Sequence, residues 1–88
     1  MQFVFDPAKD ASNRAKHGVS LAEAADLEWD TVWLRSDFRR EYGELRHIGI
    51  GYIGMRLHCV VFTDRGNERR IISLRKANTR EVAGYAKA

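Results

Sequence analysis

The chain has 88 residues, the length of one small domain, so we expect a single domain over residues 1–88 with a thin hydrophobic core. Hydrophobic residues make up 44% and charged residues 31% of the chain, a balance that excludes a disordered polypeptide. The formal net charge of +3 suits a nucleic acid or an acidic protein as a partner.

Cysteine content and hydropathy exclude further classes of protein. The single cysteine, Cys59, excludes an internal disulfide and a zinc site built from cysteines, and we expect its thiol to be buried. The opening MQFVFDPAKD lacks the features of a signal peptide, and no apolar run reaches the length of a membrane span. We therefore expect a cytoplasmic protein that does not contact the membrane.

The first predicted elements are a short strand and a helix. Residues 2–6, QFVFD, are strand-like. The pair Asp6–Pro7 is typical of a helix start, because aspartate accepts hydrogen bonds from free N–H groups and proline fits the first helical position. The helix is expected to run from Pro7 to about Lys16, and Gly18 is placed for a left-handed C-cap.

A second short helix is predicted immediately after this corner. Ser20 and Glu23 have the spacing of a capping box, in which each residue accepts a hydrogen bond from the backbone N–H of the other. This pattern places a helix from Leu21 to about Glu28.

A block of strands follows. The segment TVWL, residues 31–34, is strand-like, and residues 35–44 form a charged loop. Three longer strands, separated by turn residues, are expected at residues 45–53, 56–63 and 68–76.

The end of the chain predicts one more helix. Asn78 and Glu81 repeat the capping pattern, which predicts a helix over residues 79–87. Helices at the two ends of the chain and strands in a block predict an α+β fold with a mostly antiparallel sheet of four to five strands.

The strand at residues 68–76 carries cations at both ends, namely Arg69 and Arg70 at its start and Arg75 and Lys76 at its end. With strict alternation, Arg69 and Arg75 share one face, while Arg70 and Lys76 share the other. Arg46 continues a core-facing row of the strand at residues 45–53. If these strands form a meander, the arginines converge at one end of the sheet and can hold a phosphate.

A structural explanation of the same cations stays open. Arginines at strand ends are commonly solvated or paired with carboxylates, and five acidic residues are available for this: Asp37, Glu41, Glu44, Asp64 and Glu68.

The three histidines do not form a metal-ligand motif. They lack the H-x-x-x-H spacing of a metal-binding helix, so we expect no metal ion and no cofactor. His17 precedes Gly18, and it either covers the end of the first helix or takes part in chemistry. His47 and His58 are interpreted as packing residues within strands.

Motifs along nearly the whole chain resemble the BrnT family of bacterial toxins. The two segments that carry the resemblance are FVFDPAKDASNRAKHGVSLAEA and GELRHIGIGYIGMRLHCVVFTDRGNERRIISLRKANTREVAGY. The matched positions are Asp6, Lys9, Asn13, Lys16, His17, Gly18, Val19, Glu23, Gly43, Glu44, Arg46, Thr63, Arg65, Gly66, Arg70, Ile71, Ile72, Ser73, Arg75, Ala77, Arg80, Glu81 and Tyr85. The chain departs from the pattern at Leu21, where the family often has an aromatic residue, and residues 30–42 show no match.

The resemblance implies a RelE-like fold and the toxin half of a type II toxin–antitoxin pair. The implied partner is a BrnA-type antitoxin, which itself binds operator DNA and would link two toxins into a heterotetramer. The implied activity is metal-independent RNA cleavage that inhibits translation and growth. In this reaction the 2′-hydroxyl attacks the adjacent phosphorus and leaves a 2′,3′-cyclic phosphate.

That reaction requires a base, an acid and cations that stabilise the phosphorane. We expect Arg46 and Arg75 to clamp the phosphate and His17 to transfer protons, because imidazoles titrate near neutral pH. Lys16 is expected to hold a phosphate or, if desolvated, to act as the base. Glu44 either acts as the base or orients Arg46.

Four further cations are expected to bind RNA, namely Arg69, Arg70, Lys76 and Arg80, and Arg70 or Arg69 is expected to help the clamp. The antitoxin is expected to dock over exposed aromatic residues such as Trp33, Phe38 and Tyr42. Two alternatives stay open, a non-enzymatic module that binds RNA or protein, and an inactive toxin that acts with its antitoxin as a co-repressor.

Overall fold

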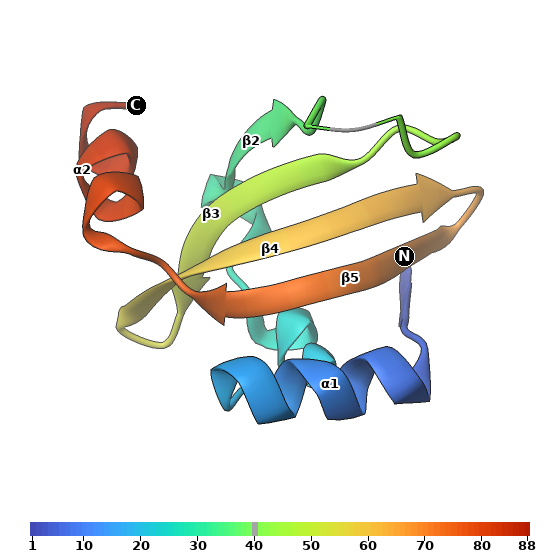
Figure 1. Ribbon diagram of the computed structural model, residues 1–88. Coiled ribbons are helices and arrows are strands. Elements are labelled where there is room, and N and C mark those ends of the chain that lie inside the picture. Colours follow the sequence, from blue (N-terminus) through green and yellow to red (C-terminus); the bar gives the residue numbers. More distant parts are fainter. Residues whose placement is uncertain (40) are drawn as a thin grey trace.

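The computed structural model describes residues 1–39 and 41–88 and builds them around one five-stranded sheet (Figure 1). The elements in chain order are β1 (Gln2–Val4), α1 (Pro7–His17), the 3₁₀-helices η1 (Leu21–Asp26) and η2 (Trp29–Thr31), β2 (Trp33–Ser36), β3 (His47–Ile53), β4 (Arg56–Arg65), β5 (Glu68–Lys76) and α2 (Thr79–Lys87). Arg40, which belongs to the predicted charged loop, lies outside the described residues.

The strand order in the sheet is β1-β5-β4-β3-β2. The pairs β2–β3, β3–β4 and β4–β5 are antiparallel, whereas β1 runs parallel to β5. The predicted α+β class and the C-terminal helix are confirmed, and the sheet is mixed because β1 returns beside β5 from the other end of the chain. The strand predicted at residues 31–34 lies two residues later, since Thr31 belongs to η2.

The second N-terminal helix differs from its prediction. The Ser20–Glu23 capping box is present, but the segment that it starts is the 3₁₀-helix η1, which ends at Asp26. The backbone N–H of Leu27 bonds to the carbonyl of Ala24, and Glu28 then donates its N–H to Tyr52 of β3 at 2.9 Å. The sheet therefore captures the chain before an α-helix can extend.

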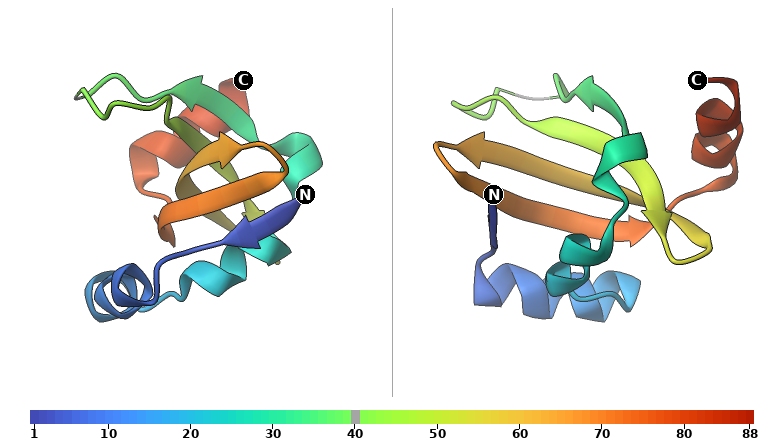
Figure 2. Two further views of the ribbon diagram at one scale, coloured as in Figure 1. Left: turned by 90° about the vertical axis from the view of Figure 1, so that its right-hand side faces the viewer. Right: turned by 180° about the vertical axis from the view of Figure 1, so that it is seen from behind.

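One face of the sheet packs against α1 and η1, and we call it the helix face. Its core contains Val60, Phe62, Ile71 and Leu74 from the two central strands, buried against Leu21 and other apolar residues of η1. Figure 2 shows α1 and the 3₁₀-helices together on this side of the sheet. Among the described residues, no helix is long and apolar enough to cross a membrane.

Asn13 fixes α1 against β5. Its side chain donates to the carbonyls of Val19 and Leu74, both at 2.8 Å, and accepts from the N–H of Leu74 at 3.2 Å. The residue is 5% exposed. Since β1 pairs only with residues 68–70, the rest of the β5 edge is open, and α1 occupies that edge instead of another strand.

A β-bulge in β5 overturns the predicted distribution of its cations. Val61 pairs with Ser73 and Phe62 with Ile71, so Ile72 is an extra residue opposite the uninterrupted strand β4. The alternation of side chains therefore reverses across Ile72. Arg70 and Arg75 share one face, and Arg69 and Lys76 share the other.

The opposite face, which we call the arginine face, carries a second apolar cluster of Ile48, Ile50, Cys59 and Val61 with their neighbours. Helix α2 covers only one end of this face, where Tyr85 packs edge-on against Tyr52 with ring centroids 5.6 Å apart. Figure 1 shows α2 set apart at that end of the sheet. Most of the arginine face is consequently free of helices.

Candidate active site

Helix α1 presents a stripe of polar side chains to the open edge of β5. Lys9, Lys16 and His17 are four residues before, three after and four after the buried Asn13, so all lie on the helical face that Asn13 turns toward the sheet. With Ser12, Ile72 and Ser73 they line a shallow depression of about 200 Å³. The two candidates for proton transfer, Lys16 and His17, thus face the bulge of β5.

A second depression, of about 170 Å³, lies beside the first and contains Lys9, Glu44, Arg46, Arg70 and Ile72. The guanidinium of Arg46 stacks over the ring of Tyr42 at 4.0 Å. Its Nε lies 3.6 Å from a carboxylate oxygen of Glu44, is buried, and has no hydrogen-bond partner among the described residues. A buried donor without a hydrogen-bond partner is costly, which makes Arg46 a candidate for binding an anion through the rest of its guanidinium.

Glu44 is held between two arginines. Arg65 donates to its carboxylate at 2.6 Å, and Arg46 approaches it from the other side. The hydrogen bond from Arg65 lowers the pKa of Glu44 below its ordinary value, and the charge of Arg46 adds to this effect. A carboxylate in this state is a weak proton acceptor, and the geometry favours an orienting role for it.

A third depression, of about 110 Å³, lies on the arginine face and includes Arg35, Arg39, Ser73, Arg75 and Glu81. Arg75 donates two hydrogen bonds of 2.8 Å to Glu81, whose carboxylate also accepts the N–H of Asn78 in the capping box of α2. The bonds from Arg75 lower the pKa of Glu81 to about 2. Arg75 is therefore already neutralised, and it anchors the start of α2.

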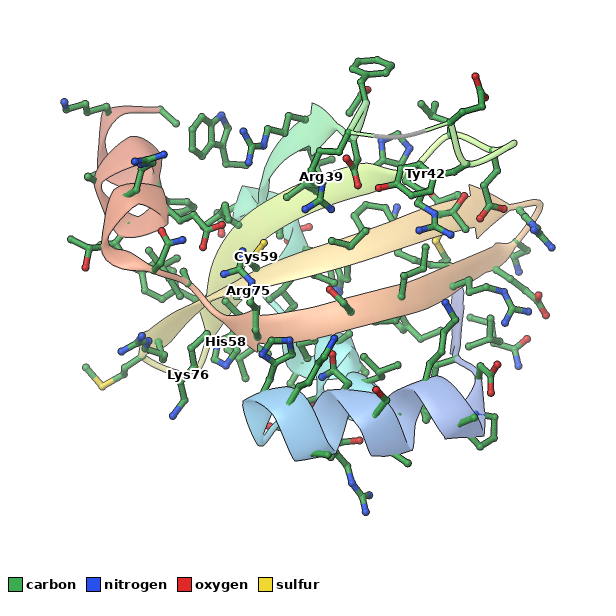
Figure 3. All side chains as sticks on the ribbon, in the orientation of Figure 1. Arg39, Tyr42, His58, Cys59, Arg75 and Lys76 are labelled. Carbon is green, nitrogen blue, oxygen red and sulfur yellow. The ribbon has the colours of Figure 1, made fainter. Side chains whose placement is uncertain are left out.

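The other cations of this depression come from β2 and the loop after it. Arg39 donates two bonds of 2.8 Å to the carboxylate of Asp37, whose side chain is fully buried. Figure 3 shows Arg39 and Arg75 over the part of the sheet that contains Cys59. Burial raises the pKa of the Cys59 thiol to about 11. The predicted burial of this cysteine is confirmed.

The three depressions adjoin one another, because Lys9 and Ile72 line both of the first two, and Ser73 lines both the first and the third. We call the three depressions together the basic groove; its cations and its histidine are Lys9, Lys16, His17, Arg35, Arg39, Arg46, Arg70 and Arg75. The predicted convergence of the arginines at one end of the sheet is wrong. Arg46 and Arg70 lie at one end, and Arg75 lies five residues farther along β5, about 15 Å away at the usual rise of a strand.

Three of the predicted RNA-binding cations lie outside the groove. Arg69 donates to Asp64 at 2.8 and 3.0 Å and stacks on the rings of Trp29 and Phe62, on the helix face. Lys76 is exposed beside its cross-strand partner His58 on the same side of the sheet (Figure 3). Arg80 is exposed in the first turn of α2.

Comparison with known proteins supplies the biological context of this groove. Residues 5–81 match the profile of a family described as the ribonuclease toxin, BrnT, of type II toxin–antitoxin systems. The chain belongs to the BrnT family. A search of curated proteins returned no match. As a member of this family the protein is a ribonuclease toxin, with RNA as its substrate and an antitoxin protein as its partner.

Several groove residues of this BrnT-family toxin were missed from sequence. Arg35 lies in β2 and Arg39 in the loop after it, within the residues 30–42 where the family pattern gave no match, and Glu81 was interpreted only as a helix cap. Lys9 was recognised as a matched position without a role. A signal was available for Lys9, since it precedes Asn13 by four residues and thus shares its helical face.

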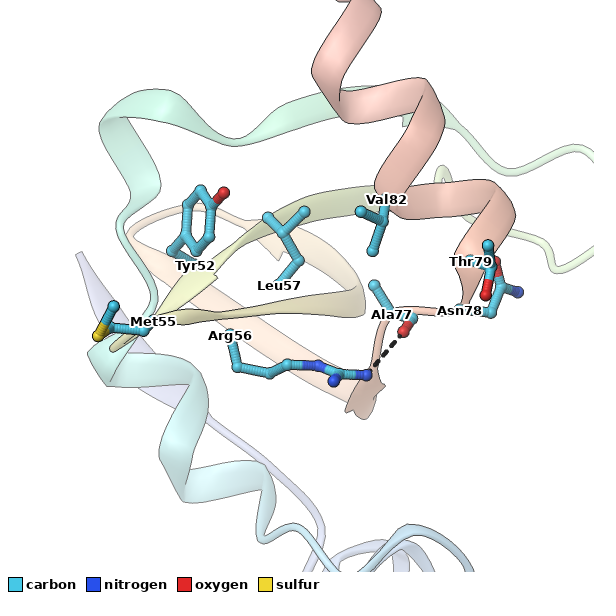
Figure 4. A pocket seen from close by; sticks show the side chains of 8 residues that line it. All are labelled: Tyr52, Met55, Arg56, Leu57, Ala77, Asn78, Thr79 and Val82. Atoms are coloured by element: carbon cyan, nitrogen blue, oxygen red, sulfur yellow. Dashed lines mark hydrogen bonds between the residues drawn. The ribbon is translucent and has the colours of Figure 1, made fainter.

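A larger hollow of the toxin lies elsewhere. A depression of about 540 Å³ between the β3–β4 turn and α2 is lined by Tyr52, Met55, Leu57 and Val82 and by polar residues of the α2 start (Figure 4). Its cation, Arg56, is engaged with the carbonyl of Ala77 at 3.1 Å. This hollow lacks the convergent cations that phosphate chemistry needs, and its size alone does not make it the active site.

Metal ligands are not grouped in the described part of the chain. Among residues 1–39 and 41–88, no cluster of three or more histidine, cysteine, aspartate or glutamate side chains could hold a metal ion. The groove is instead lined by lysine and arginine side chains.

Proposed function

We propose that the basic groove is where this toxin binds and cuts RNA without a metal ion. The single observation that carries the proposal is the adjacency of the three depressions, which brings cations of α1 and β5 close to Arg46, the residue before β3. In the proposed reaction the 2′-oxygen forms a bond to phosphorus and the bond from phosphorus to the 5′-oxygen breaks. A base takes the 2′-proton, an acid protonates the 5′-oxygen, and the products are a 2′,3′-cyclic phosphate and a 5′-hydroxyl.

His17 and Lys16 are the proposed proton-transfer groups. Both are exposed on the stripe of α1 that faces Ser73, and neither forms an ion pair among the described residues. Asn13 supports their position, because it ties α1 to Leu74 one residue beyond Ser73. A fixed helix holds these groups with little loss of rotational freedom when RNA binds.

Arg46 and Arg70 are the proposed clamp for the reacting phosphate. Among the described residues the buried Nε of Arg46 has no hydrogen-bond partner and lies 3.6 Å from Glu44, whereas Arg75 donates two hydrogen bonds of 2.8 Å to Glu81. We therefore propose that Arg75 binds RNA and holds the start of α2 at the end of the groove. It could join the clamp only if RNA displaced Glu81 from it. Glu44 orients Arg46 in this proposal.

The cations outside the groove receive lesser roles. Lys76 and Arg80 are exposed and can contact RNA that extends beyond the groove. Arg69 is committed to Asp64 and to two aromatic rings, so we assign it to stability.

The proposed partner is a BrnA-type antitoxin, and the fold is proposed to be RelE-like. In this arrangement the antitoxin binds operator DNA and joins two toxins into a heterotetramer. Its proposed contact surface includes Trp33, which is 41% exposed, and Phe38, which is 82% exposed, beside the loop that carries Arg39. Trp33 lies against Gly84 of α2, whereas Tyr42 stacks under Arg46, so a partner that covers Phe38 and Tyr42 also covers the Arg46 end of the groove.

The test is cleavage of RNA by the purified toxin in EDTA and growth arrest after its induction without antitoxin. We expect new 5′-hydroxyl ends from the wild-type chain and a loss of about 10²–10³ in rate for Arg46→Ala, as for removal of one oxyanion donor. His17→Ala and Lys16→Ala separate the proton-transfer roles, and Lys87→Ala, a distant exposed lysine, is the control. Undiminished cleavage by Arg46→Ala would remove the clamp, and cleavage only with added metal would overturn the mechanism.

A further inference from the structure

Lys9 stands at an unfavourable place for a cation. It is the third residue of α1, whose N-terminal end carries the positive pole of the helix dipole. Among residues 1–39 and 41–88, no carboxylate forms an ion pair with its ammonium group. The neighbouring Asp6 caps α1 by accepting the N–H of Ala8 at 2.8 Å. Among the described residues Lys9 therefore has no ion-pair partner within 4.0 Å, although Asp6 and Glu44 line the same depression, and the helix dipole disfavours its charge.

The same residue lies at the junction of the groove. Lys9 lines the depression of Arg46 and Arg70 and also the depression of Lys16 and His17. Its location is set by Asn13, one helical turn later, whose two hydrogen bonds with Leu74 hold α1 against β5. A cation that costs stability and is held between two candidate sites is typical of a ligand-binding residue.

We propose that Lys9 binds a backbone phosphate of RNA and connects the clamp of Arg46 and Arg70 to the proton-transfer groups of α1. The proposal rests on the function proposed above for the groove. An ammonium group suits this place because it is a compact charge on a flexible stem, which can follow a phosphate without a fixed planar geometry. The contact is to the backbone, so it is independent of the base sequence.

Two properties separate a phosphate ligand from an ordinary surface lysine. Replacing Lys9 by glutamine removes a cation from a helix N-terminus, so the melting temperature of Lys9→Gln is expected to equal or exceed that of the wild type. Lys87→Gln is the matched control, because Lys87 is an exposed lysine in the last turn of α2, where a cation is favourable. Its melting temperature is expected to stay the same or fall, and its RNA affinity to be unchanged.

The decisive measurement is the salt dependence of RNA binding. A 2′-O-methyl RNA oligonucleotide is the probe, since its blocked 2′-oxygen cannot attack phosphorus. For Lys9→Gln we expect a roughly tenfold weaker Kd at low salt, the usual effect of losing one hydrogen bond to a charged group. The slope of log affinity against log salt should become shallower by about 0.7, which corresponds to one released counterion on a single strand. Lys9→Arg should keep the slope of the wild type.

The results for Arg46→Ala and Lys9→Gln test the proposed function of the groove and the proposed role of Lys9 separately. If Arg46→Ala abolishes cleavage while Lys9→Gln keeps the affinity and slope of the wild type, the groove stands and Lys9 is not a phosphate ligand. If Lys9→Gln melts at a clearly lower temperature, the residue is structural and the proposal fails. If the wild-type toxin binds no RNA probe and cuts no RNA, both proposals are overturned together.

Discussion

Asn13 offers the most direct test of how the site is assembled, because one buried side chain holds α1 against β5. Replacement by alanine removes three hydrogen bonds and leaves the carbonyls of Val19 and Leu74 and the N–H of Leu74 without that partner. At about 1 kcal/mol for each bond, the expected loss is about 3 kcal/mol of unfolding free energy, and any unsatisfied buried group adds to it. For a chain of this length the melting temperature should fall by roughly 12–24 °C.

The assay is thermal and urea unfolding followed by far-UV circular dichroism, with cleavage measured at a temperature where the variant is folded. Ser12→Ala, one residue earlier and exposed, is the control and should change stability by less than about 0.5 kcal/mol. Asn13→Asp keeps the side-chain volume and the acceptor for Leu74, but it turns an oxygen toward two carbonyls. It should be as damaging as alanine, whereas a mild effect would mean that packing and not hydrogen bonding matters. A loss below about 1 kcal/mol for Asn13→Ala would refute the reasoning.

Two further predictions concern the core and the end of the groove. Glu81→Gln should lower the free energy of unfolding at pH 7 by about 1–3 kcal/mol. The reason is that Arg75 lowers the pKa of Glu81 to about 2, from its ordinary value of about 4.3. That contribution is complete above about pH 5 and is lost as the pH falls from about 4.3 through about 2, so the melting temperatures of the two proteins should converge in acid; a constant difference between them would contradict the ion pair. Gly49→Ala places a Cβ 2.7 Å from Cγ1 of Val32 and should cost about 1–3 kcal/mol in urea unfolding, with recovery when Val32→Ala is added; no recovery would show that the contact is not the cause.

Local sequence signals predicted most elements of the fold. The Asp6–Pro7 start, the Gly18 cap at φ 72° and both capping boxes are present, because each depends on residues close together in the chain. The parallel return of β1 beside β5 was not predictable in this way, since it joins residues 2–4 to residues 68–70. The 3₁₀ form of η1 likewise depends on a contact with β3.

The candidate site was predictable in composition but not in arrangement. His17, Lys16, Arg46 and Arg70 all line the groove, as their residue types indicated. One bulge residue, Ile72, decides which face each cation of β5 takes, and strict alternation cannot detect it. The ion pair between Arg75 and Glu81 was also not predicted, because the capping box with Asn78 already explained the position of this glutamate.

The packing of α1 against the edge of β5 has a consequence for the solubility of the protein. An open strand edge is a template for pairing with another chain, and proteins protect such edges with charges or covering elements. At Leu74 the side chain of Asn13 occupies both hydrogen-bonding groups that an incoming strand would use, and the lysines of α1 surround the same edge with positive charge. The helix that carries the proposed catalytic groups therefore also blocks pairing of this edge with a strand of another chain. Detachment of α1 would expose the edge of β5 to aggregation and would also separate the cations of the groove.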